Sequence, residues 1–247
     1  MNIQYAIQGD DVYIIEANPR ASRTVPFVSK ATGARLAQLA VRVMSGKTLA
    51  ELGLTAEITP AHVSVKEAVL PFNKFPGTDT LLGPEMRSTG EVMGIDTSFG
   101  QAFAKAELAA GQTLPQSGTV FISVNDRDKP GVIPIAKDFV SIGFNIIATS
   151  GTYRALKEAG IVVDPILKIH EGRPHVGDAL KNGDIQLIIN SPVGETAQDD
   201  DRVIRRSALD YKIPTITTLA GAKATFSAIR SLKENQLTVK ALQDYLT

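Results

Sequence analysis

The chain has 247 residues, 26 Lys and Arg residues balanced by 26 Asp and Glu residues, and no cysteine. A balanced charge gives no net field that would draw the chain to nucleic acid or to an anionic membrane surface, so neither partner is expected. The lack of cysteine excludes disulfides, thiolate catalysis and cysteine-based zinc sites. No apolar run of about 18 residues occurs. The composition predicts a cytoplasmic protein with room for two modest domains.

The opening stretch predicts a β-hairpin that turns at residues 9–11. We expect a three-residue loop, which pairs Gln8 with Val12 and places Gln4 opposite Glu16. The hairpin is the first place in the chain where side chains with oxygen ligands are brought together.

The period of two along a strand puts Glu16 and Asn18 on one face of this hairpin. A carboxylate and an amide oxygen suit a hard cation such as Mg²⁺ or Mn²⁺, and Gln4 would complete the ligand set. Arg20 and Arg23 follow, and their guanidinium groups can hold phosphate or carboxylate oxygens. The alternative is an ordinary exposed hairpin whose polar side chains are solvated.

The region after the hairpin predicts a helix over residues 29–44, broken by Gly33 into two pieces. A short helix is expected at 48–52, and extended structure at 57–60 and 64–71.

The next region ends the first domain. Residues 87–94 have the pattern of a loop, in which Gly90 and Gly94 permit close approach of another backbone. A helix is expected at 98–109, and the Gly, Pro and Ser content of residues 111–118 predicts a linker.

From Thr119 onward strands and helices alternate, which predicts an α/β domain with a parallel sheet covered on both faces. The predicted strands are 119–124, 145–149, 162–166, 186–190 and 215–218, and the predicted helices are 130–142, 152–159, 175–181, 199–211 and 221–232.

Ligands of such sheets bind beyond the carboxyl ends of the strands. Residues 149–152, Thr-Ser-Gly-Thr, lie where a strand passes into a helix, so backbone N–H groups and hydroxyls there favour an anion. Lys129, Lys168 and Asn190 lie near other strand ends, and together they form a candidate phosphate site. The alternative is that Thr149 and its neighbours are ordinary helix caps.

Several motifs resemble the carbamoyl-phosphate synthase large chain over essentially the whole sequence. They are Gln4, IEANPRASRTVPFVSK at 15–30, Lys66-Glu67, LPFNKF at 70–75 and PEMRSTGE at 84–91. The resemblance is to the C-terminal quarter of that family's chain, so Met1 is expected to be an internal methionine or a truncated start. It implies the C-terminal part of an ATP-grasp domain at 1–110, a linker at 111–118, and a doubly wound methylglyoxal-synthase-like domain at 119–247.

The resemblance also implies roles for the candidate residues. Gln4, Glu16 and Asn18 would hold Mg²⁺ or Mn²⁺ and, through the metal, the substrate ATP, while Arg20 and Arg23 would stabilise the transferred phosphoryl group. Nucleotides such as UMP and IMP would bind as effectors at residues in the second domain. These residues are Lys129, Thr149, Thr152, Lys168 and Asn190.

An ornithine effector site is implied at Glu67, Leu70 and Thr217. The chain departs from the family there, since Thr215 stands where a tyrosine is expected, and Pro192 replaces a threonine of the nucleotide site. Free methylglyoxal synthases have a catalytic Gly-Gly-Asp run where this chain has Gly-Glu-Thr at 194–196. The second domain is therefore expected to bind ligands without turning them over.

The family works with a small glutamine amidotransferase subunit and makes carbamoyl phosphate for pyrimidine and arginine biosynthesis. The glycine-rich lid and the adenine pocket of an ATP-grasp unit are not found before Gln4. They are expected in a missing N-terminal part of the large chain, and the 247 residues alone are expected to have no synthase activity.

Overall fold

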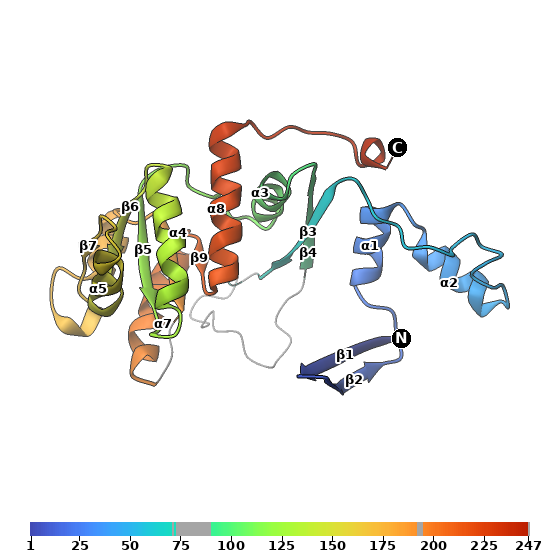
Figure 1. Ribbon diagram of the computed structural model, residues 1–247, viewed down its shortest axis with the longest axis horizontal. Helices are drawn as coiled ribbons and strands as arrows, with labels where there is room; N and C mark the ends of the chain where they lie inside the picture. Colours follow the sequence, from blue (N-terminus) through green and yellow to red (C-terminus); the bar gives the residue numbers. More distant parts are fainter. Residues whose placement is uncertain (71, 73–89, 192–194, 247) are drawn as a thin grey trace. The chain divides into compact units, whose positions relative to one another are not determined.

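The computed structural model describes residues 1–70, 72, 90–191 and 195–246, without the side chains of 195–200 (Figure 1). The chain forms two compact units. The first contains residues 1–62 and 239–247, and the second contains residues 63–238. No helix in the described ranges is long and apolar enough to cross a membrane.

The first unit contains little buried structure. It consists of strands β1 (Asn2–Gln8) and β2 (Asp11–Asn18), helices α1 (Thr24–Thr32) and α2 (Leu36–Met44), and a C-terminal 3₁₀ turn (Leu242–Tyr245). Among the described residues of this unit, Ala31 alone is buried. His62 joins its two chain segments: its Nε2 lies 2.8 Å from the Ala31 carbonyl, and its ring meets the edge of the Tyr245 ring.

The predicted break between the two helices is confirmed. Gly33 ends α1 with a φ of 77°, a left-handed conformation that glycine adopts without a steric penalty. The helix predicted at 48–52 is wrong, because these residues form turns. Thr48 and Glu51 exchange the hydrogen bonds of a helix start, with the Thr48 amide 2.8 Å from the Glu51 carboxylate, but Gly53 stops the chain in a left-handed turn.

The hairpin register is partly as predicted. Gln4 pairs with Glu16, but Gln8 pairs with Asp11, so the turn has two residues and the predicted pairing of Gln8 with Val12 is wrong. The register shifts at a β-bulge between Gln4 and Tyr5, where β2 contains one extra residue. This shift allows the two-residue turn and the pairing of Gln4 with Glu16 to occur in one hairpin.

The second unit begins with an antiparallel pair, β3 (Val63–Val69) and β4 (Gly90–Asp96), which packs against α3 (Phe99–Ala109). The expected loop at 87–94 is therefore wrong for residues 90–94, and Arg87 lies outside the described residues. Gly94 does permit close approach, as expected: a Cβ there would lie 2.0 Å from the Ala102 carbonyl oxygen. The neighbouring backbone is that of α3, so this glycine serves packing.

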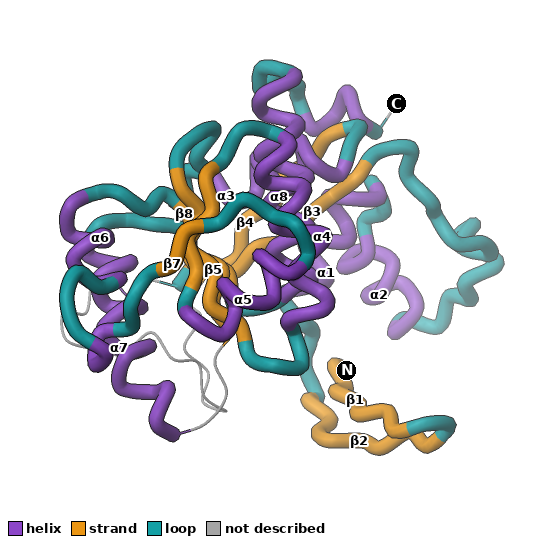
Figure 2. Tube along the Cα trace, turned by 60° about the vertical axis from the view of Figure 1, so that its left-hand side comes forward, coloured by secondary structure: helices purple, strands orange, loops and turns teal. Residues whose placement is uncertain are grey.

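The rest of the second unit is a five-stranded parallel sheet in the order β7-β6-β5-β8-β9. Figure 2 draws its strands in orange and labels β5, β7 and β8. The helices that follow these strands in the chain cover both faces, so the doubly wound architecture is confirmed. The strands are β5 (Thr119–Val124), β6 (Asn145–Ala148), β7 (Asp164–Pro165), β8 (Leu187–Ser191) and β9 (Thr215–Ile216). The helices are α4 (Lys129–Ser141), α5 (Ser150–Glu158), α6 (Val176–Asn182), α7 (Glu195–Asp210) and α8 (Leu219–Glu234).

Alternation along β5 divides the core into two parts. Val120 and Ile122 point to α4, α5 and α8, whereas Phe121, between them, points to α6 and α7; all three are fully buried. The same alternation places Ile188 with Phe121 and Ile189 with Ile122. Buried on both faces, these strands read as continuous apolar runs, which is why the sequence predicted them closely.

Candidate functional site

The first candidate site lies on the β1–β2 hairpin. The Asn18 amide nitrogen donates a hydrogen bond of 2.9 Å to the Glu16 carboxylate, so both side chains lie on one face, and Gln4 is the strand partner of Glu16. Because a carboxylate accepts this bond, the amide oxygen of Asn18 is turned away from Glu16 and is left for another partner. Within the described residues no group of three or more His, Asp or Glu side chains forms a metal cage.

The two arginines that follow are both exposed. Arg20 donates to the Ala21 carbonyl at 3.1 Å, and Arg23 occupies the N-cap position of α1. A guanidinium at a helix N-terminus adds to the positive potential there, which suits an oxyanion. The hairpin and α1 together therefore offer oxygen ligands for a cation and, a few residues later, cations for an anion.

The second candidate site lies at the carboxyl ends of the parallel strands. Strand β5 pairs with β6 on one side and β8 on the other, so the connections diverge at this point and leave room for a ligand. The register places Ser123 beside Asn190, and the Ser123 hydroxyl lies 3.0 Å from the Thr149 hydroxyl. These three side chains form one polar row across the strand ends, directly beyond an apolar row that contains Phe121 and Ile188.

Two threonines of the expected Thr-Ser-Gly-Thr turn are buried but serve different contacts. Thr149 holds the N-cap position of α5 without capping it, because its hydroxyl meets Ser123 instead. The first amides of α5 are thus left without a side-chain cap. The Thr152 hydroxyl accepts from the Val124 amide at 3.1 Å, which ties α5 to the end of β5. Capping by Thr149, the alternative explanation for this turn, is contradicted.

Lys129 is brought to this turn from the start of α4. A Cβ built on Gly151 would lie 3.0 Å from the Lys129 ammonium, so this cation lies against the first turn of α5. The positive end of the helix and the ammonium reinforce each other. Lys168 follows β7, where the chain continues the sheet through a bond from the Ile166 amide to the Ala148 carbonyl. Its side chain is half-buried.

Partners of Asn190 and a second set of polar side chains, none of which the sequence reasoning found, complete this region. The Asn190 amide nitrogen donates to Asp201 on α7 at 2.9 Å, and both residues are buried. Asp128 accepts from the Ser191 hydroxyl at 2.7 Å and from the Asn125 amide at 2.8 Å. The polar run directly after β5, Asn125 to Asp128, was the signal that could have revealed this network, because it lies at the divergence of the sheet.

The three residues of the expected ornithine site come from two different sheets. Glu67 lies on β3, Leu70 follows it, and Thr217 follows β9. Thr215 opens β9, and Pro192 and Gly194 lie outside the described residues.

Burial raises the pKa of Glu107 on α3 to about 7, and the negative charge of Glu67 adds to this increase.

Comparisons with known proteins match these two regions separately. The family of the carbamoyl-phosphate synthase L chain ATP-binding domain matches residues 1–52, and the MGS-like domain family matches residues 131–217. A carbamoyl phosphate synthase large chain from Synechocystis is 66% identical over 247 residues, which are 100% of this chain and 23% of the relative. An arginine-specific large chain from Oryza sativa is 60% identical and covers 99% of this chain and 21% of its own.

A solved methylglyoxal synthase from Elizabethkingia anophelis covers 46% of this chain and 80% of its own, at 20% identity and a TM-score of 0.39. That similarity is too low to support a statement about function. The sequence relatives agree over the whole chain, which spans about a quarter of their length.

Proposed function

Because the chain belongs to the carbamoyl phosphate synthase large-chain family, we propose that it forms the part of a glutamine-hydrolysing synthase that joins an ATP-grasp end to a nucleotide-sensing domain. The observation that carries this proposal is the match at 66% identity along the whole chain. Since the chain spans only a quarter of such relatives, it would act within a longer large chain and with a small amidotransferase subunit. We expect this enzyme in the cytoplasm.

The hairpin is proposed to contribute to carbamate phosphorylation. Glu16, Asn18 and Gln4 would hold Mg²⁺ or Mn²⁺, and the joined side chains of Glu16 and Asn18 fit such an oxygen-ligand set. The bound cation would supply charge neutralisation for the phosphates of ATP. Arg20 and Arg23 would orient the oxygens of the transferred group by charge-assisted hydrogen bonds.

Activity measurements test the proposal that the rest of the large chain is needed for catalysis. Because the chain covers only 23% of such a relative, the 247 residues alone should form no carbamoyl phosphate from bicarbonate, ammonia and ATP. Formation of carbamoyl phosphate by the purified chain at a rate above the no-protein background would refute the proposal that the rest of the catalytic unit is needed.

The second domain is proposed to bind a nucleotide monophosphate such as UMP or IMP as an effector. The polar row of Thr149, Ser123 and Asn190, with the Lys129 ammonium at the uncapped turn of α5, supports this proposal. A phosphate would gain backbone N–H groups, hydroxyls and a cation in one place. Lys168 would add a second cation, because it follows β7, the strand at one edge of the same sheet.

Calorimetry with UMP and with IMP on the 247-residue chain tests the effector site. Lys129→Ala should weaken binding by about tenfold, because a charge-assisted contact to phosphate is lost. Lys137→Ala is the matched control, since Lys137 is exposed on the same helix outside the site. Failure of the parent chain to bind either nucleotide would remove the sensor assignment, and an equal loss in the control would remove the assignment of Lys129.

A further inference from the structure

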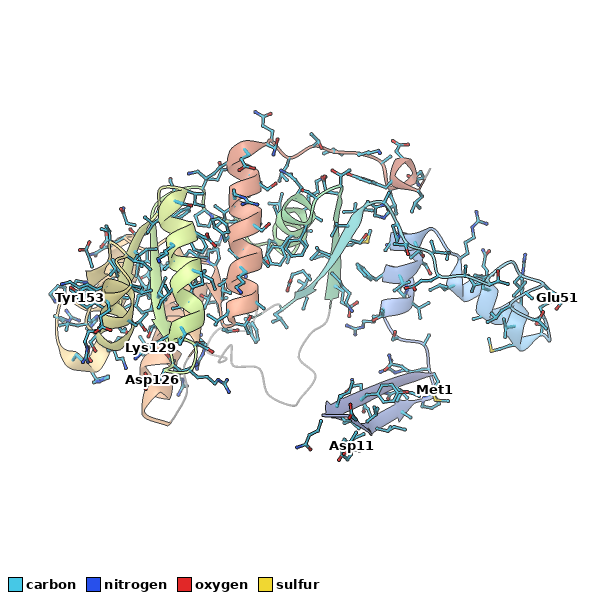
Figure 3. The ribbon with its side chains drawn as sticks, in the orientation of Figure 1. Met1, Asp11, Glu51, Asp126, Lys129 and Tyr153 are labelled. Carbon is cyan, nitrogen blue, oxygen red and sulfur yellow. The ribbon has the colours of Figure 1, made fainter. Side chains whose placement is uncertain are left out.

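The cation of the proposed nucleotide site already has an anion beside it. Asp126, in the turn after β5, places Oδ1 2.5 Å from the Lys129 ammonium, and Figure 3 shows the two residues together at the start of α4. The Lys129 side chain is 24% exposed, whereas that of Asp126 is 95% exposed. The carboxylate therefore approaches the lysine from the solvent side.

The position of this carboxylate is close to where a ligand phosphate is expected. The ammonium that it contacts is the same one that lies against Gly151 in the first turn of α5. An anion that used both the ammonium and the helix amides would have to share Lys129 with Asp126 or replace it. If the ligand anion and the Asp126 carboxylate both contacted the Lys129 ammonium, the two negative groups would be close enough to repel each other.

The structure shows why Asp126 can leave. In the described part of the chain its side-chain contact is with Lys129 alone, and its exposure means that rotation toward water sacrifices no packing. Asp128, two residues later, is different, because Asn125 and Ser191 both hold its carboxylate in place. Lys129 lowers the pKa of Asp126 by a hydrogen bond and by its charge, so Asp126 is negative at neutral pH.

We propose that Asp126 is a built-in competitor for the phosphate of the ligand: its carboxylate neutralises Lys129 in the empty protein, so that binding exchanges one anion for another and is weaker than Lys129 alone would make it. This inference rests on the proposed effector function. A ligand that carries its own phosphate can replace the carboxylate, whereas a neutral nucleoside gains nothing from Lys129 while the ion pair stands. Asp126 thus sets how far Lys129 favours nucleotides over nucleosides, and it makes that preference smaller than it would be without the carboxylate.

The test is calorimetry on the whole 247-residue chain with three ligands: UMP, inorganic phosphate and uridine. Asp126→Asn removes the competing charge and keeps the shape, so UMP and phosphate should bind about threefold more tightly, since exposed ion pairs are weak. Binding of uridine should not change. Asp138→Asn, at an exposed position farther along α4, carries the same change in net charge and should leave all three affinities unchanged.

A double-mutant cycle identifies the route of the effect. In a Lys129→Gln background the gain from Asp126→Asn should vanish, because no ammonium remains to compete for. Unchanged or weaker UMP binding by Asp126→Asn would overturn the inference, and weaker binding would identify Asp126 as a contact of the ligand. If the parent chain bound neither UMP nor phosphate, the proposed effector site itself would fail, which is a different result from failure of the exchange.

Discussion

The β1–β2 hairpin and the parallel sheet contain similar apolar residues but place them very differently. In the hairpin Tyr5 is 54% exposed and Ile14 is 66% exposed, whereas Phe121 and Ile188 in the sheet are fully buried. Apolar side chains stabilise a fold only by the area that they remove from water. The comparison therefore predicts that the sheet provides most of the free energy of unfolding. The hairpin should contribute little to this free energy, and its role is to present candidate ligand side chains.

The largest effect is expected in the sheet core. Phe121→Ala should reduce the free energy of unfolding by about 3–5 kcal/mol, because it removes a fully buried ring between β5 and the α6–α7 face. Urea unfolding followed by circular dichroism at 222 nm measures this. A loss below about 1 kcal/mol would mean that this face of the sheet is not the main core.

The contact between β4 and α3 is expected to be nearly as sensitive. Gly94→Ala forces a Cβ to within 2.0 Å of the Ala102 carbonyl, so the strand and the helix must separate, at a cost of about 3 kcal/mol. Gly90→Ala is the control, since a Cβ there would meet Val69 at an ordinary 3.4 Å. Equal melting temperatures for the two variants would contradict the close approach.

A smaller effect depends on pH. Burial raises the pKa of Glu107 to about 7, and the charge of Glu67 contributes, so the folded chain resists ionisation of this carboxyl group. A raised folded-state pKa gives stability that is present below the unfolded value, which is 4.5, and that is lost as pH rises through about 7.

Glu107→Gln should therefore flatten this pH dependence. At pH 8 the variant should be more stable than the parent by about 2–3 kcal/mol, and near pH 5 the difference should be much smaller. Urea midpoints at the two pH values provide the measurement, and Glu57→Gln is an exposed control. Parallel pH profiles for parent and variant would show that Glu107 is hydrated in the fold.

The smallest effect is expected in the hairpin. Ile14→Ala should change the free energy of unfolding by less than about 0.5 kcal/mol, since its side chain is already mostly in water. A loss comparable to that of Phe121→Ala would show that the hairpin is covered in solution, and would reverse the ranking of the two regions.

The accuracy of the sequence interpretation follows the same division. Strands β5 and β8 were predicted closely because double-sided burial leaves long apolar runs in the sequence. The short strands β7 and β9 were predicted too long, since two residues of pairing leave little pattern to read. The turn at Thr48 was mistaken for a helix because its capping contacts are real and only the following glycine stops it.

The candidate sites were predictable to the extent that they depend on strand parity and strand ends. Glu16 and Asn18 share a face because of the period of two, and Lys129 lies against Gly151 in the turn after β6 because carboxyl ends gather at one edge of a parallel sheet. The hydrogen bond from Asn190 to Asp201 was not predictable, because it joins side chains 11 residues apart on two different elements, β8 and α7, and depends on how α7 packs on the sheet.

The β-bulge in the hairpin makes the length of the turn independent of the pairing of Gln4 with Glu16. Without it the pairing near the turn would continue to the strand ends, and Gln4 would face Ile15 instead of Glu16. The one extra residue in β2 thus lets the turn shorten or lengthen by a single position while Gln4, Glu16 and Asn18 stay aligned. Insertions and deletions at the tip of the hairpin should therefore be tolerated when a compensating change occurs at the bulge.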